Sequence, residues 1–203
     1  MNNNLKQYFL EYLDFPMTFV NGKILELVDE YFNKIPDYFY KVPASSTGKY
    51  HPSFDLGEGG LLRHTQMVCE TMREFERMDE YKNLNFFDMM IACILHDTFK
   101  NGYVDNERTV SSHANIAADE FYNTYVYHKY SKEDLEETVG NVTYNYAGEL
   151  DQRIMNICNM TRTHTGQWGA IKPQSNCEKL VHLADYVASR KIWDKFNGVT
   201  NDC

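Results

Sequence analysis

The sequence predicts an all-α fold, and three observations carry that prediction. Apolar residues recur at intervals of three and four along most of the chain, which is the spacing of one face of an α-helix. Alternation of apolar and polar residues, which marks a half-buried strand, is nearly absent. Glycine, proline and serine gather between the apolar stripes, above all from Pro43 to Gly60, where a long loop is expected.

Two apolar stripes precede that loop. The first consists of Leu5, Tyr8, Phe9, Tyr12 and Leu13, and the second, which ends before Pro36, consists of Ile24, Leu27, Val28, Tyr31 and Phe32. Both have helical spacing. We therefore expect residues 1–42 to be an N-terminal helical segment that packs on the core, and residues 43–203 to complete one structural domain.

The middle of the chain predicts three helices. Apolar residues from 61 to 75 form the first, with His64 near its start. Residues 86–97 are apolar nearly all round, so that helix is expected in the centre of the protein. A polar loop over residues 98–111 then leads to a helix that begins near His113.

The next predicted helix begins near residue 131. Ser131 and Asp134 have the spacing of a helix N-cap and a first-turn carboxylate. Leu135, Val139 and Val142 continue the helical spacing beyond them. We expect a helix across these residues.

Two more helices complete the chain. The first covers residues 150–161, and His164 follows its C-terminal end. The second covers residues 177–188 and carries Asp185 midway. Each has apolar residues at intervals of three and four.

Charge and composition restrict the partners. The formal net charge is −9, and a negative field opposes long-range attraction of a polyphosphate backbone. Long duplex nucleic acid is therefore an unexpected partner. A small nucleotide or short oligonucleotide stays compatible, because a bound divalent cation can dominate the local field.

The chain also lacks the features of a membrane or disulfide-stabilised protein. Its longest apolar run, Met89–Leu95, is far shorter than the ~20 residues that a membrane helix needs, and nothing resembles a signal peptide. The cysteines are odd in number and include no Cys-x-x-Cys pair: Cys69, Cys93, Cys158, Cys177 and Cys203. We expect reduced thiols, no membrane partner and a cytoplasmic location. A homo-oligomer is left open.

The adjacent pair His96-Asp97 follows that apolar run directly. Burying two such groups is unfavourable unless something satisfies them, and a divalent metal ion does so. The same residue types recur at or near other helix ends, or midway along the last helix, so helices can present them to one cavity. The predicted metal ligands are His64, His96, Asp97, His113, His164 and Asp185.

These residues fall in an order that resembles a known family. Gly60-Leu61-Leu62-Arg63-His64-Thr65, His96-Asp97-Thr98-Phe99-Lys100, His113, His164 and Ala184-Asp185-Tyr186 are similar to the two-metal branch of the HD-domain metal-dependent phosphohydrolase superfamily, over roughly residues 43 to 192. Pro43-Ala44, Tyr50-His51-Pro52 and Gly59-Gly60-Leu61 resemble the HD domain of YhaM-type 3′→5′ exoribonucleases. His164-Thr165-Gly166 and residues 178–186 resemble YqeK-type dinucleoside-tetraphosphate hydrolases.

The resemblance implies an HD-domain helical bundle with a metal site in its centre. His64, His96, Asp97 and Asp185 would hold one metal ion, and Asp97 would bridge to a second ion held by His113 and His164. Asp97 and Lys100 would be catalytic, with Lys100 contacting the phosphate or the leaving group. Mixed nitrogen and oxygen ligands leave Mn, Fe, Co, Ni and Zn open.

Five further residues are candidates for substrate binding: Lys49, His51, Arg63, Trp168 and Arg190. The first three and Arg190 are cationic or hydrogen-bonding groups that suit phosphate, but each is equally an ordinary surface or packing residue. Trp168 can stack on a nucleobase or pack against a helix. His182 is expected either in the core or as a partner of a metal ligand.

Together these features predict an enzyme. We expect a metal-dependent phosphohydrolase that cleaves a phosphodiester or phosphoanhydride bond in a nucleotide, dinucleotide or short oligonucleotide through a metal-bound hydroxide. The alternatives are a deoxynucleoside triphosphohydrolase, a catalytically silent HD module that binds a nucleotide in signalling, and an oxygenase with a mixed-valent iron pair.

Overall fold

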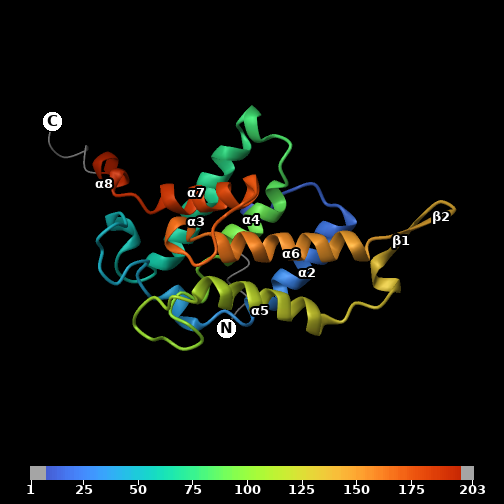
Figure 1. Ribbon diagram of the computed structural model, residues 1–203, viewed down its shortest axis with the longest axis horizontal. Coiled ribbons are helices and arrows are strands. Elements are labelled where there is room, and N and C mark those ends of the chain that lie inside the picture. The colour runs from blue at the N-terminus through green and yellow to red at the C-terminus, as the bar shows by residue number, and fades with distance from the viewer. Residues whose placement is uncertain (1–7, 198–203) are drawn as a thin grey trace.

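A computed structural model describes residues 8–197, and they form a mostly helical fold (Figure 1). The helices are α2 (Phe19–Phe32), α3 (Gly60–Glu76), α4 (Phe86–Leu95), α5 (His113–His128), α6 (Ala147–Thr163), α7 (Asn176–Ala188) and the short α8 (Ile192–Asn197). Short 3-10 turns lie between them: η2 (Leu10–Leu13), η3 (Asp37–Tyr40), η4 (Ser53–Asp55), η5 (Asp79–Tyr81), η6 (Glu133–Leu135) and η7 (Gly166–Trp168). The predicted helical class is confirmed.

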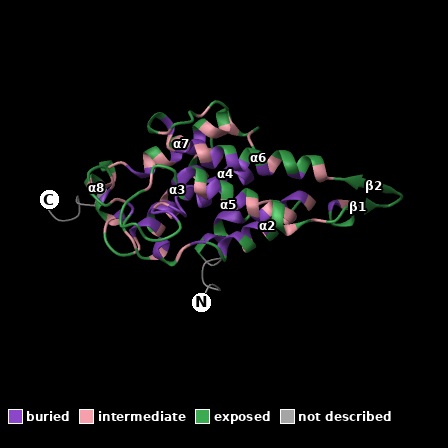
Figure 2. Cartoon of the chain, turned by 60° about the horizontal axis from the view of Figure 1, so that its bottom comes forward, coloured by how far each residue is buried: buried purple, intermediate pink, exposed green. Residues whose placement is uncertain are grey.

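The central helix is α4. Every residue of Phe86–Leu95 is buried, and the helix packs against α3, α6 and α7. Figure 2 shows the buried residues concentrated where these helices meet. Asn85 caps α4, since its side-chain oxygen accepts the backbone N–H of Asp88 at 3.1 Å. The prediction of a central helix over this segment is confirmed, and it ends directly before His96.

The N-terminal part shares the same core. Helix α2 packs against α5 and α6, and η2 packs against α3 and α4. Tyr31 of α2 is fully buried, and its hydroxyl lies 2.5 Å from the hydroxyl of Thr98. Of the first predicted stripe, Leu5 lies outside the described residues. Residues 10–13 form a 3-10 turn.

The helix predicted after residue 131 is wrong. The cap forms, because Ser131 Oγ accepts the backbone N–H of Asp134 at 3.2 Å, but helical structure ends after the single turn η6. The chain continues into an antiparallel hairpin of β1 (Glu136–Val139) and β2 (Val142–Asn145). Figure 1 shows this hairpin projecting from the end of the molecule opposite α8.

The hairpin has a local cause. Gly140 has a φ of 64°, and with Asn141 it forms the two-residue connection between Val139 and Val142. Valine and threonine on both strands favour extended backbone. The three- and four-residue spacing of Leu135, Val139 and Val142 fits a helix as well as this hairpin, so turn chemistry decided the outcome.

The loop before α3 is held by glycine. Gly59 adopts a left-handed conformation with φ of 71°, and Gly60 begins the helix. A Cβ on Gly60 would lie 1.9 Å from the carbonyl oxygen of Asp55. Only glycine permits this approach. As a result the η4 turn, which carries Asp55, lies directly against the first turns of α3, which carry His64.

None of the described helices is both long and apolar enough to cross a lipid bilayer. Cys69, Cys93 and Cys158 are buried, Cys177 is half-buried, and all four are free thiols. Burial raises the pKa of the Cys69 thiol well above its ordinary value. Cys203 lies outside the described residues.

Candidate metal centre and substrate cavity

The helices bring the predicted ligands together in two groups of three. His64, His96 and Asp185 form one group, and Asp97, His113 and His164 form the other. Within each group the ligand atoms all lie within 4.8 Å of one another. In Figure 1 the ligand-bearing ends of α3, α5 and α6 lie toward the end of the molecule occupied by α8. The gathering predicted from the sequence is present.

Asp97 lies between the two groups. Its Oδ1 is 3.1 Å from Nε2 of His113 and 3.7 Å from Nε2 of His164. Its Oδ2 is 3.5 Å from Nε2 of His96, which belongs to the other group. One carboxylate thus reaches both groups, because it has two oxygens and each faces a different set of imidazoles.

Three of the histidines are oriented in the same way. Nδ1 of His96, His113 and His164 lies 2.6 to 2.8 Å from the carbonyl oxygen three residues earlier in the chain, that of Cys93, Val110 and Thr161 respectively. A nitrogen that faces a carbonyl carries the proton and donates it. The other nitrogen, Nε2, therefore keeps its lone pair and points it toward Asp97, as in metal-binding histidines.

His64 is held between two carboxylates. Its Nε2 is 3.1 Å from Oδ1 of Asp185, and its Nδ1 is 3.3 Å from Oδ2 of Asp55. Asp55 is fully buried, and the same Oδ2 lies 3.3 Å from Nδ1 of His51. Asp55 is not among the residues predicted from the sequence. The feature of the sequence that could have indicated it is a carboxylate in the loop just before Gly59-Gly60, which lead to His64.

The pKa values of the buried histidines and aspartates at the centre are shifted by burial and by one another's charges. Burial alone would lower the pKa of His64, but the carboxylates of Asp185 and Asp55 raise it to about 9. Burial lowers the pKa of His96 to about 4. Burial would raise the pKa of Asp97, but the ammonium of Lys100 and the ring of His96 hold it well below its usual range. The carboxylates are therefore ionised, and they demand positive charge nearby.

The residues fit divalent metal ions. His96 Nε2 and Asp97 Oδ1 are buried and have no hydrogen-bond partner. Nε2 of His113 lies 3.3 Å from Nε2 of His164 and 3.1 Å from Asp97 Oδ1, so lone pairs of acceptors face one another. Buried acceptors without a donor are unfavourable. A cation among them satisfies all of them, and their nitrogen and oxygen atoms are ordinary metal ligands.

A cavity of about 580 Å³ lies beside these residues. Its lining includes Asp97, His113, His164 and Asp185 from the metal centre. Lys100 also lines it, with a mostly buried side chain whose Nζ lies 2.5 Å from Asp97 Oδ2. The volume is in the range of small-molecule sites, roughly 300 to 1,000 Å³.

The predicted substrate residues divide between this cavity and other places. His51, Trp168 and Arg190 line the cavity. Lys49 is exposed outside the lining, with its Nζ 5.0 Å from the centre of the Tyr50 ring.

Arg63 binds the loop before α3 instead of lining the cavity. Its guanidinium donates to the carbonyl oxygens of Phe54, Glu58 and Leu56, at 2.6, 2.8 and 3.1 Å. It therefore holds the loop before α3 rather than facing the cavity. His182 contacts the backbone of a predicted metal ligand, since its Nδ1 lies 2.7 Å from the carbonyl oxygen of His164.

Comparisons of the chain with protein-family models, with curated proteins and with solved structures find no match. The ligand atoms of the two groups indicate which metal ions the centre could bind. Imidazole nitrogen and carboxylate oxygen, without a thiolate among the grouped ligands of the described residues, suit Mn, Fe, Co, Ni or Zn.

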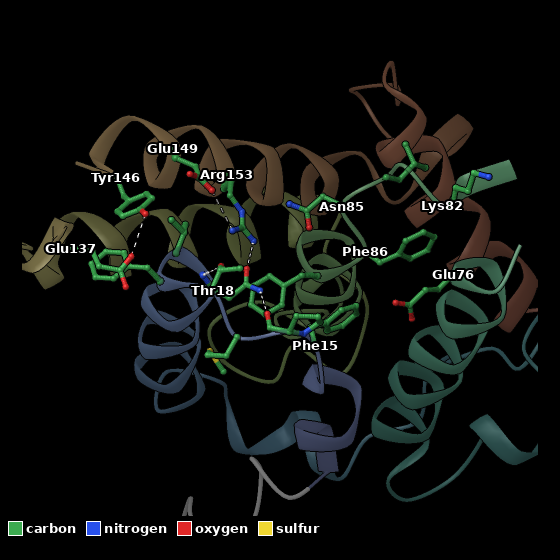
Figure 3. Close-up of a pocket in the computed structure, with 17 residues that line it drawn as sticks. Phe15, Thr18, Glu76, Lys82, Asn85, Phe86, Glu137, Tyr146, Glu149 and Arg153 are labelled. Carbon is green, nitrogen blue, oxygen red and sulfur yellow. Dashed lines mark hydrogen bonds and ion pairs between the residues drawn. The ribbon is translucent and has the colours of Figure 1, made fainter. Parts of the chain in front are cut away.

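A second cavity, of about 950 Å³, lies between α2, α4 and α6, away from these ligands (Figure 3). Two cations of the described residues line it, Lys82 and Arg153. Arg153 is paired, because Nη2 donates to Asp88 Oδ1 at 2.6 Å and to Asn21 Oδ1 at 2.8 Å. Within residues 8–197 the groups that could hold a metal lie elsewhere, so this cavity is not a candidate metal centre.

Proposed function

We propose that this chain is a metal-dependent phosphohydrolase of the HD-domain type. It would cleave a phosphodiester or phosphoanhydride bond in a nucleotide, dinucleotide or short oligonucleotide. The observation that carries the proposal is the pair of ligand groups that meet at Asp97, with Lys100 and a nucleotide-sized cavity on the same side. A helical bundle with inward-facing ligands is also the architecture that the HD resemblance implies.

Each ligand has a place in the proposal. His64, His96 and Asp185 would hold one divalent ion, and His113 and His164 would hold a second, with Asp97 shared between them. Bound ions would supply Lewis-acid chemistry: an activated water nucleophile at neutral pH and neutralisation of charge on the phosphoryl group. The Nδ1 hydrogen bonds of His96, His113 and His164 keep three Nε2 atoms ready without rearrangement.

Lys100 supports the choice of phosphate chemistry. Its side chain is only 12% exposed, and its ammonium lies on the cavity wall in contact with Asp97. Three hydrogen-bond donors on a buried cation suit the oxygens of a phosphoryl or leaving group. Among anionic substrates, the net charge of −9 favours small ones over long polyanions, because the charge of a small substrate can be met inside the cavity rather than along the surface.

The first test is hydrolysis of bis-(p-nitrophenyl) phosphate across Mn²⁺, Fe²⁺, Co²⁺, Ni²⁺ and Zn²⁺. Wild type should be active with at least one metal, and Asp97→Ala should be inactive. Asp88→Asn is the matched control, because Asp88 is an equally buried carboxylate of α4 that contacts Arg153 outside the cavity. Activity in both wild type and Asp97→Ala, or in neither across the panel, contradicts the proposal.

Product masses then identify the subgroup. Cyclic nucleotides, dinucleotides, deoxynucleoside triphosphates and short RNA should be incubated with the active metal form. A nucleoside monophosphate indicates a phosphodiesterase, a nucleoside diphosphate indicates cleavage of a dinucleotide bridge, and inorganic triphosphate indicates a deoxynucleoside triphosphohydrolase. Nucleotide binding without turnover indicates the silent signalling module, and oxygen consumption by the iron-loaded protein indicates the oxygenase.

A further inference from the structure

An aromatic and cationic surface borders the mouth of the metal cavity. The rings of Trp168 and Tyr186 are nearly parallel, with 12° between their planes and 6.0 Å between their centres. The guanidinium of Arg190 lies 4.2 Å from the centre of the Tyr186 ring and 5.9 Å from that of Tyr50. Trp168, Arg190 and Tyr50 line the cavity itself. We call these four residues the stacking surface.

The stacking surface is fixed to the metal ligands. Trp168 lies in η7, four residues after His164, and Tyr186 follows Asp185 directly. The η7 turn rests on the ring of His182: Gly166 has a φ of 55°, and a Cβ there would lie 2.1 Å from that ring. The ring in turn contacts the His164 carbonyl at 2.7 Å. Trp168 is thus held at a set position relative to the centre.

The exposure of Trp168 needs an explanation. Trp168 is 64% exposed at the wall of the metal cavity, although burying a ring of this size is favourable. One side of the indole faces Tyr186, and the centre of the His182 ring lies 6.2 Å from that of the indole, with the two planes 69° apart. One face of the indole is thus covered by Tyr186, and its other face can accept a flat ligand in the cavity.

The charges select the ligand. Arg190 and Lys100 place two cations on the cavity wall, and the carboxylates of Asp97 and Asp185 on the same wall are predicted metal ligands. With divalent ions on those carboxylates, the cavity of this protein would favour an anionic group. Aromatic faces next to cations bind nucleobases, because every base has a π-face and its phosphate pairs with the cation. A sugar phosphate or a phosphopeptide would use the cations and leave the indole uncovered.

We infer that the stacking surface is a base-binding subsite, with the nucleobase of the substrate on the open face of Trp168. The inference rests on the proposed function and specifies it: the substrate carries a nucleobase, and the base is held by stacking. Stacking alone tolerates different bases, so purine and pyrimidine nucleotides both bind. Tyr186, whose ring is nearly parallel to the indole, acts as a positioning residue behind it, and Arg190 lines the cavity beside it.

The test separates base binding from hydrolysis. The variant Trp193→Phe leaves Trp168 as the sole tryptophan, and its fluorescence is titrated with adenosine 5′-monophosphate and with ribose 5-phosphate, which is the same phosphate without the base. Both titrations are run on metal-free protein and with Zn²⁺ added. The nucleotide should quench Trp168 saturably and bind roughly 5- to 100-fold more tightly than the sugar phosphate.

Calorimetry on variants completes the test. Trp168→Ala should reduce nucleotide affinity to that of ribose 5-phosphate, and Trp168→Phe should retain part of the preference. Tyr127→Ala is the matched control, because Tyr127 is a 72% exposed aromatic of α5 outside the cavity. Equal binding of the two ligands by wild type, or an unchanged preference in Trp168→Ala, overturns the subsite. If the protein binds the nucleotide more tightly than ribose 5-phosphate but hydrolyses no substrate, the base-binding subsite is supported and only the proposed hydrolysis is contradicted.

Discussion

The carboxylate of Asp55 lies 3.3 Å from Nδ1 of His64, while Asp185 lies 3.1 Å from Nε2 of the same ring. An imidazole between two carboxylates can bind a metal ion through one nitrogen while the other nitrogen donates to the outer carboxylate. Such outer partners fix the tautomer and raise the basicity of the ligand. Asp55 is brought into place by the glycine contact at the start of α3.

Removal of Asp55 should weaken the metal centre. Asp55→Ala removes the carboxylate that lies 3.3 Å from Nδ1 of His64, so we expect metal affinity to fall about 10- to 100-fold. Asp55→Asn keeps an acceptor oxygen and should lose less. Competition with a chromophoric chelator measures both. Wild-type affinity in Asp55→Ala would show that Asp55 does not support His64.

Metal binding should release a proton from His64. Its pKa of about 9 in the folded chain exceeds its ordinary value of 6.5, so the protonated ring stabilises the metal-free fold. That contribution is fully present below pH 6.5 and is lost as the pH rises through about 9. A metal ion displaces this proton, so apparent affinity should rise with pH up to that point. Calorimetry in buffers of different ionisation enthalpy counts the protons, and no release near pH 7 would contradict the expectation.

Asp97 should matter more to metal content than either histidine of its group. Asp97→Ala removes the carboxylate that faces both ligand groups, whereas His113→Ala or His164→Ala removes one ligand from one group. We expect loss of both ions in the first variant and of one ion in the others. Elemental analysis of the purified proteins gives ions per chain. The reverse order would disprove the shared role of Asp97.

Gly60→Ala should destabilise the fold by the clash with the Asp55 carbonyl, which lies 1.9 Å from the new Cβ. Because the obstacle is backbone, we expect a loss of about 1–3 kcal/mol in the free energy of unfolding. Gly148→Ala is the control: this position in α6 has open space, and alanine there should stabilise by up to about 1 kcal/mol. Urea unfolding of both variants measures the difference.

The buried ion pair between Asp88 and Arg153 should support stability without serving the metal centre. The side chains are 3% and 11% exposed, and their closest atoms are 2.6 Å apart. Asp88→Ala removes the closest carboxylate from a buried guanidinium and leaves it only the Asn21 oxygen at 2.8 Å and Glu149 at 3.9 Å, which should reduce the free energy of unfolding by about 3–5 kcal/mol. Ions bound per folded chain should be unchanged. A loss of metal at unchanged stability would assign Asp88 to the centre instead.

Turn chemistry limited the secondary-structure prediction. Periodicity identified the helices that carry His64, His113 and Asp185, because a buried helix face imposes its spacing on the sequence. It failed where Leu135, Val139 and Val142 fit two structures at once. Val139 and Val142 are exposed in the hairpin, so burial placed little constraint on them, and the Gly140-Asn141 turn together with the strand-favouring valine and threonine residues decided the structure.

The sequence by itself determined which residues could be ligands, since histidine and aspartate beside apolar helical segments need a partner when buried. The resemblance in the sequence already implied the division of these ligands, with Asp97 between the two sets. Only the tertiary structure gave the distances from Asp97 to each group and placed Asp55 beside His64. The tertiary structure also showed that Arg63 donates to carbonyl oxygens of the loop before α3 and that Trp168 lines the cavity. Spacing along a chain fixes the face of a helix, whereas the packing of helices distant in sequence sets the distances between ligands.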